Sequence, residues 1–261
     1  YKRQMEDYAR DAVALYLRIT GIDKLRKAST PFCPDGSLIP SDDCERGELA
    51  GNACKVLMKA LWLARLSRPD IQKPICDLAT HIQIWTKNDD KRLYRLIAYI
   101  DSSLSYRLTG QVQDPPELLQ LCLFVDADFS GEVECTRSTS GGFLVLHGPH
   151  TWFPISWLSK RQTSTSRSTT EAEVISLAAS LFSEAIPHLD LWELILGRKI
   201  PLIIMEDNQA TIKVIRKGYS PKLRHIQRTH KVNLGSIKES IERNDAELRY
   251  CHTTFQSADI F

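Results

Sequence analysis

The stretch that decides the fold is Leu118–Asp128, LLQLCLFVDAD, in which an apolar run ends abruptly in two aspartates. A short apolar run of this kind predicts a buried strand, here over Leu118–Val125. Two more strands are predicted over Gly142–Leu146 and Pro154–Leu158, because Gly and Pro turns bound them. Residues 111–116 (QVQDPP), just before the first strand, predict a linker.

Helices and strands alternate after these three strands. Apolar periodicity predicts, in chain order, helices over Ser168–Ala185 and Leu189–Leu196, a strand over Leu202–Met205, a helix ending near Arg216, a helix over His225–Ile241, a strand over Ala246–Cys251 and a helix beginning near Gln256. This order indicates an α/β fold with a mixed sheet over residues 117–261.

The residues before the linker predict helices instead. Four segments carry apolar residues at helical spacing: Tyr8–Ile19, Ala53–Leu66, Pro74–Trp85 and Asp90–Leu104. A turn-rich stretch over 29–47 separates the first two. We therefore expect a mostly helical region over 1–110, a linker over 111–116 and the α/β domain over 117–261.

Composition excludes several classes of protein. The chain has 261 residues, of which 43% are hydrophobic, and its 12 Gly and 12 Pro are too few for a low-complexity chain. We expect no membrane span, because no apolar run approaches the ~18 residues that one requires. The 7 cysteines are scattered without a C-x-x-C pair, which favours reduced thiols in an intracellular, cytoplasmic protein. Tyr1 and Phe261 both look like cuts, so a fragment of a longer polypeptide is expected.

Acidic residues recur where the predicted strands end. Asp126 ends the first strand, Glu173 lies in the first helix after the strands, Asp207 follows the fourth strand, and Asp259 begins the last helix. Strand ends in an open α/β sheet converge on one crevice. Carboxylates gathered there repel one another unless a cation neutralises them, and oxygen ligands suit Mg²⁺ or Mn²⁺. Two such ions can hold a phosphodiester for in-line attack by water.

Neighbouring acids are assigned other tasks. Asp126 is preferred to Asp128, which shapes the turn or supports the site from further out. Ser168 and Glu171 have capping-box spacing, and Glu173 lies about 200° further round the helix, which leaves Glu173 as the ligand. Glu206 points to the other face of its strand from Asp207 and is expected to be solvated.

The histidines do not predict a second metal site. His225 and His230, together with Cys251 and His252, are residue types that could form a metal site. On one continuous helix their spacing of five residues puts them on different faces, so separate structural roles are favoured. His252, just before the last acid, could assist proton transfer or product release.

Basic residues are concentrated between the third and fourth acids. The net charge is only +2, from 34 basic and 32 acidic residues, yet no acid lies between Asp207 and Glu239. A one-signed stretch indicates contacts with phosphates. Its cations are Lys213, Arg216, Lys217, Lys222, Arg224, Arg228, Lys231 and Lys238, and Lys160, Arg161 and Arg167 form a second basic patch.

The local sequences resemble a known family. In order they are V-D-A-D-F-S-G-E (125–132), R-S-T-S-G-G (137–142), P-I-S-W-L-S-K-R-Q (154–162), S-T-T-E-A-E (168–173), E-D-N-Q-A (206–210) and S-A-D-I-F (257–261). Together they closely resemble the ribonuclease H domain of copia-type (Pseudoviridae) retrotransposon Pol polyproteins. S-T-P-F (29–32) and L-A-R-L-S-R-P-D-I (63–71) resemble the segment that connects reverse transcriptase to that domain.

The resemblance implies a fold, a reaction and a set of residues. The fold is a five-stranded mixed sheet flanked by helices, and the reaction is endonucleolytic cleavage of RNA in an RNA–DNA hybrid with two Mg²⁺ or Mn²⁺ and no small-molecule cofactor. Asp126, Glu173, Asp207 and Asp259 match the family's metal ligands, and Gln209, Thr169 and Thr170 match positions that sense the RNA 2′-hydroxyl, where the family often has Asn in place of the Thr pair. The implied partner is the reverse transcriptase domain of the same polyprotein, inside a virus-like particle.

Two other functions are alternatives to a ribonuclease H. The first is a non-catalytic module that binds the hybrid and supports an adjacent polymerase. The second is an integrase-like transposase, which the D–E–D–D order of acids and the lack of an upstream His/Cys array disfavour. No aromatic-x-Asp-Asp motif is present, so polymerase activity is not expected here.

Overall fold

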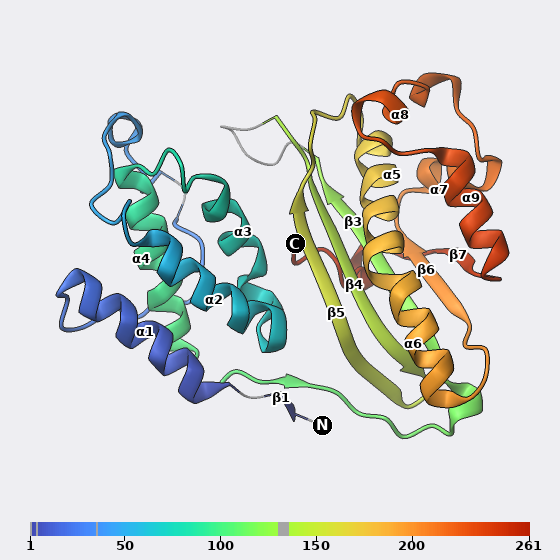
Figure 1. The fold of residues 1–261 in the computed structure, drawn as a ribbon, viewed down its shortest axis with the longest axis horizontal. Coiled ribbons are helices and arrows are strands. Elements are labelled where there is room, and N and C mark those ends of the chain that lie inside the picture. The colour runs from blue at the N-terminus through green and yellow to red at the C-terminus, as the bar shows by residue number, and fades with distance from the viewer. Residues whose placement is uncertain (1, 4, 35, 130–135) are drawn as a thin grey trace. The chain divides into compact units, whose positions relative to one another are not determined.

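The structure is a computed structural model that describes residues 2–3, 5–34, 36–129 and 136–261 (Figure 1). Two compact units divide the chain, one over Lys2–Leu108 and one over Thr109–Phe261. Residues 130–132 of the V-D-A-D-F-S-G-E motif, and Cys135, lie outside the described residues. The other six cysteines are free thiols.

The unit over Lys2–Leu108 is helical. Its buried side chains include Leu63, Ile75, Leu93 and Ile97, which come from three different helices. Thr86 and Asp89 form a capping box that starts the last helix three residues before the predicted Asp90. The elements are α1 (Glu6–Thr20), α2 (Ala53–Ser67), α3 (Gln72–Thr80) and α4 (Lys87–Ser102), with 3₁₀ turns at Pro40–Cys44 and Pro69–Ile71 and a short pair of strands, β1 (Lys2–Arg3) and β2 (Leu108–Thr109). All four predicted helices are present, although α3 ends at Thr80, before the predicted Trp85.

The unit over Thr109–Phe261 is built on a mixed sheet. The strand order is β5-β4-β3-β6-β7, in which β3, β4 and β5 are antiparallel neighbours and β3, β6 and β7 run parallel. This confirms the predicted five-stranded mixed sheet flanked by helices. The strands are β3 (Gln120–Asp128), β4 (Thr139–Gly148), β5 (Thr151–Arg161), β6 (Leu202–Glu206) and β7 (Glu247–Tyr250).

Residues 111–116, which the sequence predicted as a linker, lie against this sheet. Gln111 forms a backbone bridge with Trp152 of β5. The carboxylate of Asp114 accepts a hydrogen bond from the backbone N–H of His150. A 3₁₀ turn over Pro116–Leu118 then leads into β3.

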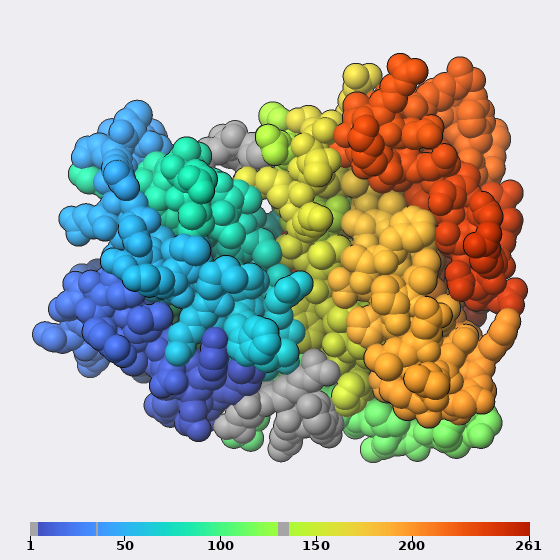
Figure 2. Space-filling view, viewed as in Figure 1, coloured from blue at the N-terminus to red at the C-terminus, as the bar shows by residue number. Residues whose placement is uncertain are grey.

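One face of the sheet is covered by helices, seen toward the viewer in Figures 1 and 2. Val174 and Leu177 of α5 pack on Leu123 of β3 and Leu144 of β4 to form the core. The helices are α5 (Thr169–Ser180), α6 (Ile186–Leu196), α7 (Gln209–Lys217), α8 (Ile226–Thr229) and α9 (Leu234–Arg243).

Three helix predictions were wrong in detail. A π-helical turn over Leu181–Ala185 joins α5 to α6, so the two predicted helices form one continuous helical segment. The predicted helix over His225–Ile241 is broken into α8 and α9, and between them Lys231 adopts φ 60°, which a helix cannot accommodate. The predicted last helix near Gln256 is instead a 3₁₀ turn over Thr253–Phe255 followed by hydrogen-bonded turns.

The continuous segment Thr169–Leu196 is long and apolar enough, by length and composition alone, to cross a membrane. Half of its most apolar window is buried inside the unit. A core helix that covers a sheet has the same pattern, and this is weak support for a membrane span.

A close approach of α5 to β4 makes Gly142 a sensitive position. A Cβ atom there would lie 2.9 Å from the Cβ of Ser180. We expect Gly142→Ala to lower the free energy of unfolding by about 1–3 kcal/mol, because the strand and the helix must separate. Urea unfolding measures this, with Gly51→Ala as the control, since nothing lies within 4 Å of a Cβ at Gly51. Equal stability of the two variants would contradict the prediction.

Candidate active site

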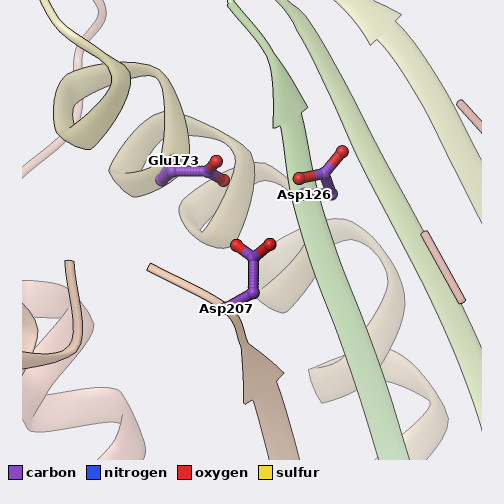
Figure 3. A group of neighbouring side chains, drawn as sticks. All are labelled: Asp126, Glu173 and Asp207. Atoms are coloured by element: carbon purple, nitrogen blue, oxygen red, sulfur yellow. The ribbon is translucent and has the colours of Figure 1, made fainter. Parts of the chain in front are cut away.

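Three carboxylates from three different elements meet at one edge of the sheet. Asp126 lies in β3, Glu173 in α5, and Asp207 directly after β6. β3 and β6 are parallel neighbours with Phe124 opposite Met205, so Asp126 and Asp207 are level with each other. One ligand atom from each of the three side chains lies within 4.8 Å of the others (Figure 3).

Asp259 is outside this group of three but influences it. It is an exposed residue in the turn that follows the 3₁₀ segment after β7. Burial is the main cause that raises the pKa of Asp126, and the negative charge of Asp259 adds to it. Burial is likewise the main cause that raises the pKa of Asp259, and the negative charge of Asp207 adds to that. Asp259, the fourth predicted acid, therefore lies near the other three but outside the group whose ligand atoms are within 4.8 Å of one another.

The carboxylates are electrostatically unfavourable as they stand. Burial, followed by the charges of Asp259 and Asp207, raises the pKa of Asp126 to about 6. Burial raises the pKa of Glu173 as well, and Glu206 is the largest of the charges that add to this effect. The Oε2 atom of Glu173 is buried without a hydrogen-bond partner. Repulsion and an unsatisfied oxygen are what a bound cation would relieve.

The structure contradicts the prediction made for Glu206. It was expected to be solvated, yet it is fully buried, at 0% exposure. Strand alternation places Glu206 on the same face of β6 as Leu202 and Ile204, and that face packs under the helices. Its Oε1 accepts a hydrogen bond from the backbone N–H of Asn208, while its Oε2 has no partner. Burial is the main reason why its pKa is raised.

The residues present fit a divalent metal ion. The available ligand atoms are all carboxylate oxygens, which Mg²⁺ and Mn²⁺ prefer. The three side chains come from different elements of the fold, so tertiary structure brings them together. Asp126, Glu173 and Asp207 could therefore hold a metal.

Hydrogen bonds from neighbouring side chains fix the elements that carry the acids. Ser176 Oγ donates to the backbone carbonyl of Asp126 at 2.5 Å, and Gln256 Nε2 donates to that of Val125 at 2.8 Å. Thr253 Oγ1 donates to Oδ2 of Asp207 at 2.9 Å. Sequence reasoning did not single out these three residues, because only the folded chain places them beside the acids.

The Thr253 bond leads to a prediction. We expect Thr253→Val to weaken Mg²⁺ binding by about tenfold, because Asp207 loses the donor that orients its carboxylate. Isothermal titration with Mg²⁺ measures the effect. Thr253→Ser keeps the hydroxyl and should bind Mg²⁺ as the unaltered protein does, as should the neighbouring Thr254→Val. Equal affinity in Thr253→Val and Thr253→Ser would contradict the prediction.

The residues predicted to contact substrate are at the surface. Gln209 opens α7 next to Asp207, and Thr169 and Thr170 open α5, with Thr170 half-buried. Arg224 is held over the ring of Tyr219, 5.5 Å from its centroid. The exposed side chains of the set are Lys160, Thr169, Gln209, Lys213, Lys217, Arg224 and Arg228, and Arg161 is half-buried.

His225 and His230 converge on one carboxylate, contrary to the prediction from helical spacing. His225 and His230 flank α8, and His225 Nε2 lies 3.0 Å from Oε1 of Glu171 while His230 Nε2 lies 3.6 Å from the same atom. Glu171 also caps α5, although its side chain accepts from the backbone N–H of Arg167 rather than that of Ser168. This contact joins the basic segment around α8 to the start of the helix that carries Glu173.

Comparison with known proteins agrees with the motifs. The "Retrovirus-related Pol polyprotein from transposon RE1" of Arabidopsis thaliana is 28% identical over 205 residues, which are 78% of this chain. The corresponding polyprotein from transposon RE2 is 30% identical over 172 residues, 65% of this chain. This chain is a homologue of retrovirus-related Pol polyproteins. The resemblance to copia-type polyproteins drawn from the motifs is thereby confirmed.

The homology covers a small part of these Pol polyproteins, 13% of the length of the first and 11% of the second. A "Secreted RxLR effector protein 161" of Plasmopara viticola is also 30% identical over 118 residues, 45% of this chain and 78% of the relative. No protein-family model matches. Among solved structures, LC11-RNase H1 isolated from compost aligns with 54% of this chain and 90% of its own, at 12% identity and a TM-score of 0.34.

Proposed function

We propose that the unit over Thr109–Phe261 is a ribonuclease H that cleaves RNA in RNA–DNA hybrids during retroelement reverse transcription. The observation that carries this proposal is the convergence of Asp126, Glu173 and Asp207 at one sheet edge, in a homologue of Pol polyproteins. A cluster of mutually repelling carboxylates, of which Glu173 is buried and Asp126 and Asp207 are half-buried, is costly to a fold, and metal-dependent phosphodiester hydrolysis gives it a use.

The acids would hold two Mg²⁺ or Mn²⁺ ions: Asp126, Glu173 and Asp207 directly, with Asp259 completing the set. Bound there, the metal would activate the attacking water and stabilise the leaving 3′-oxygen. Glu173 would hold its position because the residues of α5 that follow it, Val174 and Leu177, are packed into the core. Asp207 is oriented by Thr253. None of the acids forms a covalent bond to the substrate in this proposal.

The substrate would be held by surface groups around the acids. Lys213, Lys217, Arg224 and Arg228 are exposed cations on α7 and around α8 and would contact phosphates of the hybrid. Gln209, Thr169 and Thr170 begin the two helices nearest the acids, where they would meet the 2′-hydroxyls of the RNA strand.

The helical unit over Lys2–Leu108 would be the connection region at the end of reverse transcriptase. Its place before the sheet unit agrees with the order of the motifs S-T-P-F and L-A-R-L-S-R-P-D-I. The partner would then be the polymerase domain of the same polyprotein. As part of such a polyprotein, the chain would act inside the cell, in a virus-like particle.

A cleavage assay tests the proposal. The purified chain is incubated with a labelled RNA–DNA hybrid, duplex RNA, duplex DNA or single-stranded RNA, each in Mg²⁺ and in EDTA. We expect cuts within the RNA strand of the hybrid, in Mg²⁺ alone. Binding of the hybrid without cleavage in Mg²⁺ or Mn²⁺ would overturn the proposal and favour the non-catalytic module.

A further inference from the structure

A pocket of about 320 Å³ lies beside α5, on a different side of this helix from the carboxylates. Glu173 belongs to the acidic cluster, whereas Ile175, two residues later and about 200° round the helix, lines the pocket. The end of β5 and the segment between α8 and α9 supply the remaining walls. None of the three clustered acids lines this pocket, and of the residues predicted to contact substrate only Lys160 and Arg161 do.

Basic and apolar side chains line the pocket together. Lys160, Arg161 and Lys231 line it, and none of the described residues around it is acidic. Its apolar lining includes Ile175, Ala178, Ala179 and the ring of Phe182, which is 44% exposed. Because the ring of Phe182 is this exposed inside the pocket, a flat aromatic ligand can stack on it.

A buried polar side chain also borders the pocket. The side chain of His230 is 1% exposed, its ring nitrogens make no hydrogen bond of normal geometry, and its nearest carboxylate oxygen is 3.6 Å away. A buried imidazole of this kind has hydrogen-bonding capacity left for a ligand. His230 lines the pocket together with Lys231.

We infer that this pocket binds one unpaired nucleotide of a single-stranded nucleic acid, with its base on Phe182 and its phosphate against Lys160 and Lys231. A cavity of this size is at the lower end of the range for small-molecule sites, which suits one nucleotide. Proteins that bind single-stranded nucleic acids combine cations that contact the phosphates of the strand with aromatic side chains on which its bases stack. The inference rests on the proposed function only in taking nucleic acid as the ligand. It adds a site for the strand that continues beyond the hybrid.

The test is binding of fluorescein-labelled (dT)₈ to the full chain in EDTA, followed by anisotropy. We expect Phe182→Ala to weaken binding at least about fivefold, because a stacked base contributes that much or more, and Phe182→Trp to restore it. Lys231→Gly, which suits the φ of 60° at this position, should weaken binding and reduce its salt dependence. Leu194→Ala on α6, an exposed apolar residue outside the pocket, is the matched control.

Several results would overturn the inference. The first is equal affinity of the Phe182→Ala and Leu194→Ala variants for (dT)₈. The second is competition by inorganic phosphate that is as strong as competition by thymidine monophosphate. The third is equally strong competition by an octaglutamate peptide, which would indicate an acidic protein ligand. Cleavage of a blunt hybrid is measured on the Phe182→Ala and Leu194→Ala variants and should be unchanged in both. That second readout separates failure of the pocket from failure of the proposed nuclease, since (dT)₈ binding requires neither metal nor hybrid.

Discussion

Replacing Asp207 with Asn is expected to reduce cleavage of the RNA–DNA hybrid by about a thousandfold or more. The substitution removes one negative charge from the three clustered carboxylates but keeps their shape. The remaining Oδ1 of Asn can still accept the hydrogen bond from Thr253, so the fold should persist. Metal-assisted stabilisation of a transition state is worth several kcal/mol, and about 4 kcal/mol corresponds to a factor of a thousand.

The measurement is single-turnover cleavage in Mg²⁺, together with the dissociation constant for the hybrid in EDTA. Asp128→Asn is the matched control, because Asp128 is on the same strand but outside the cluster. We expect Asp128→Asn to cleave within about threefold of the unaltered protein, and both variants to bind the hybrid normally. Cleavage at the normal rate by Asp207→Asn would show that the acidic cluster is not the catalytic site.

The second large effect concerns stability and pH in the absence of metal. The folded pKa of Asp126 is about 6, against an ordinary value of 3.8, so the native state holds more protons than the unfolded chain between these two values. The free energy of unfolding should therefore fall as pH rises through this window, by about 3 kcal/mol for Asp126 alone. The raised pKa values of Glu173 and Glu206 extend the decline to higher pH.

Hydrogen exchange of the β3 and β6 amides, measured in EDTA from pH 4 to 8, tests this decline. Glu206→Gln should flatten the curve and raise stability at pH 8 by about 1–3 kcal/mol, because the acceptor for Asn208 remains while the charge does not. Asp190→Asn, on the exposed side of α6, should leave the curve unchanged. Saturating Mg²⁺ should stabilise the protein more at pH 8 than at pH 5. A stability that increases from pH 4 to pH 8 in EDTA would contradict the account.

The sequence predicted the sheet and the three clustered acids because each signal was local. The apolar run before Asp126 and the short strand before Asp207 specify parallel strands whose ends coincide. The same local reasoning was wrong for Glu206, since strand alternation does not tell which face the helices cover. Only the packing of α5 and α7 decides that Glu206 is buried.

The second group of errors arises where the chain leaves regular structure. Helical spacing separated His225 from His230, but both side chains approach Oε1 of Glu171 from the two ends of the short helix α8. Thr253 had no signal in the sequence, because its importance depends on a hydrogen bond to a residue 46 positions earlier. Contacts of this kind depend on tertiary structure, which periodicity does not encode.

The most direct test of the central claim is to locate a metal ion in crystals grown with Mn²⁺. The account predicts anomalous density bonded to carboxylate oxygens of Asp126, Glu173 and Asp207, and loss of that density in the Asp207→Asn variant. Anomalous density at other sites with none at these three side chains, in a protein saturated with Mn²⁺, would contradict it.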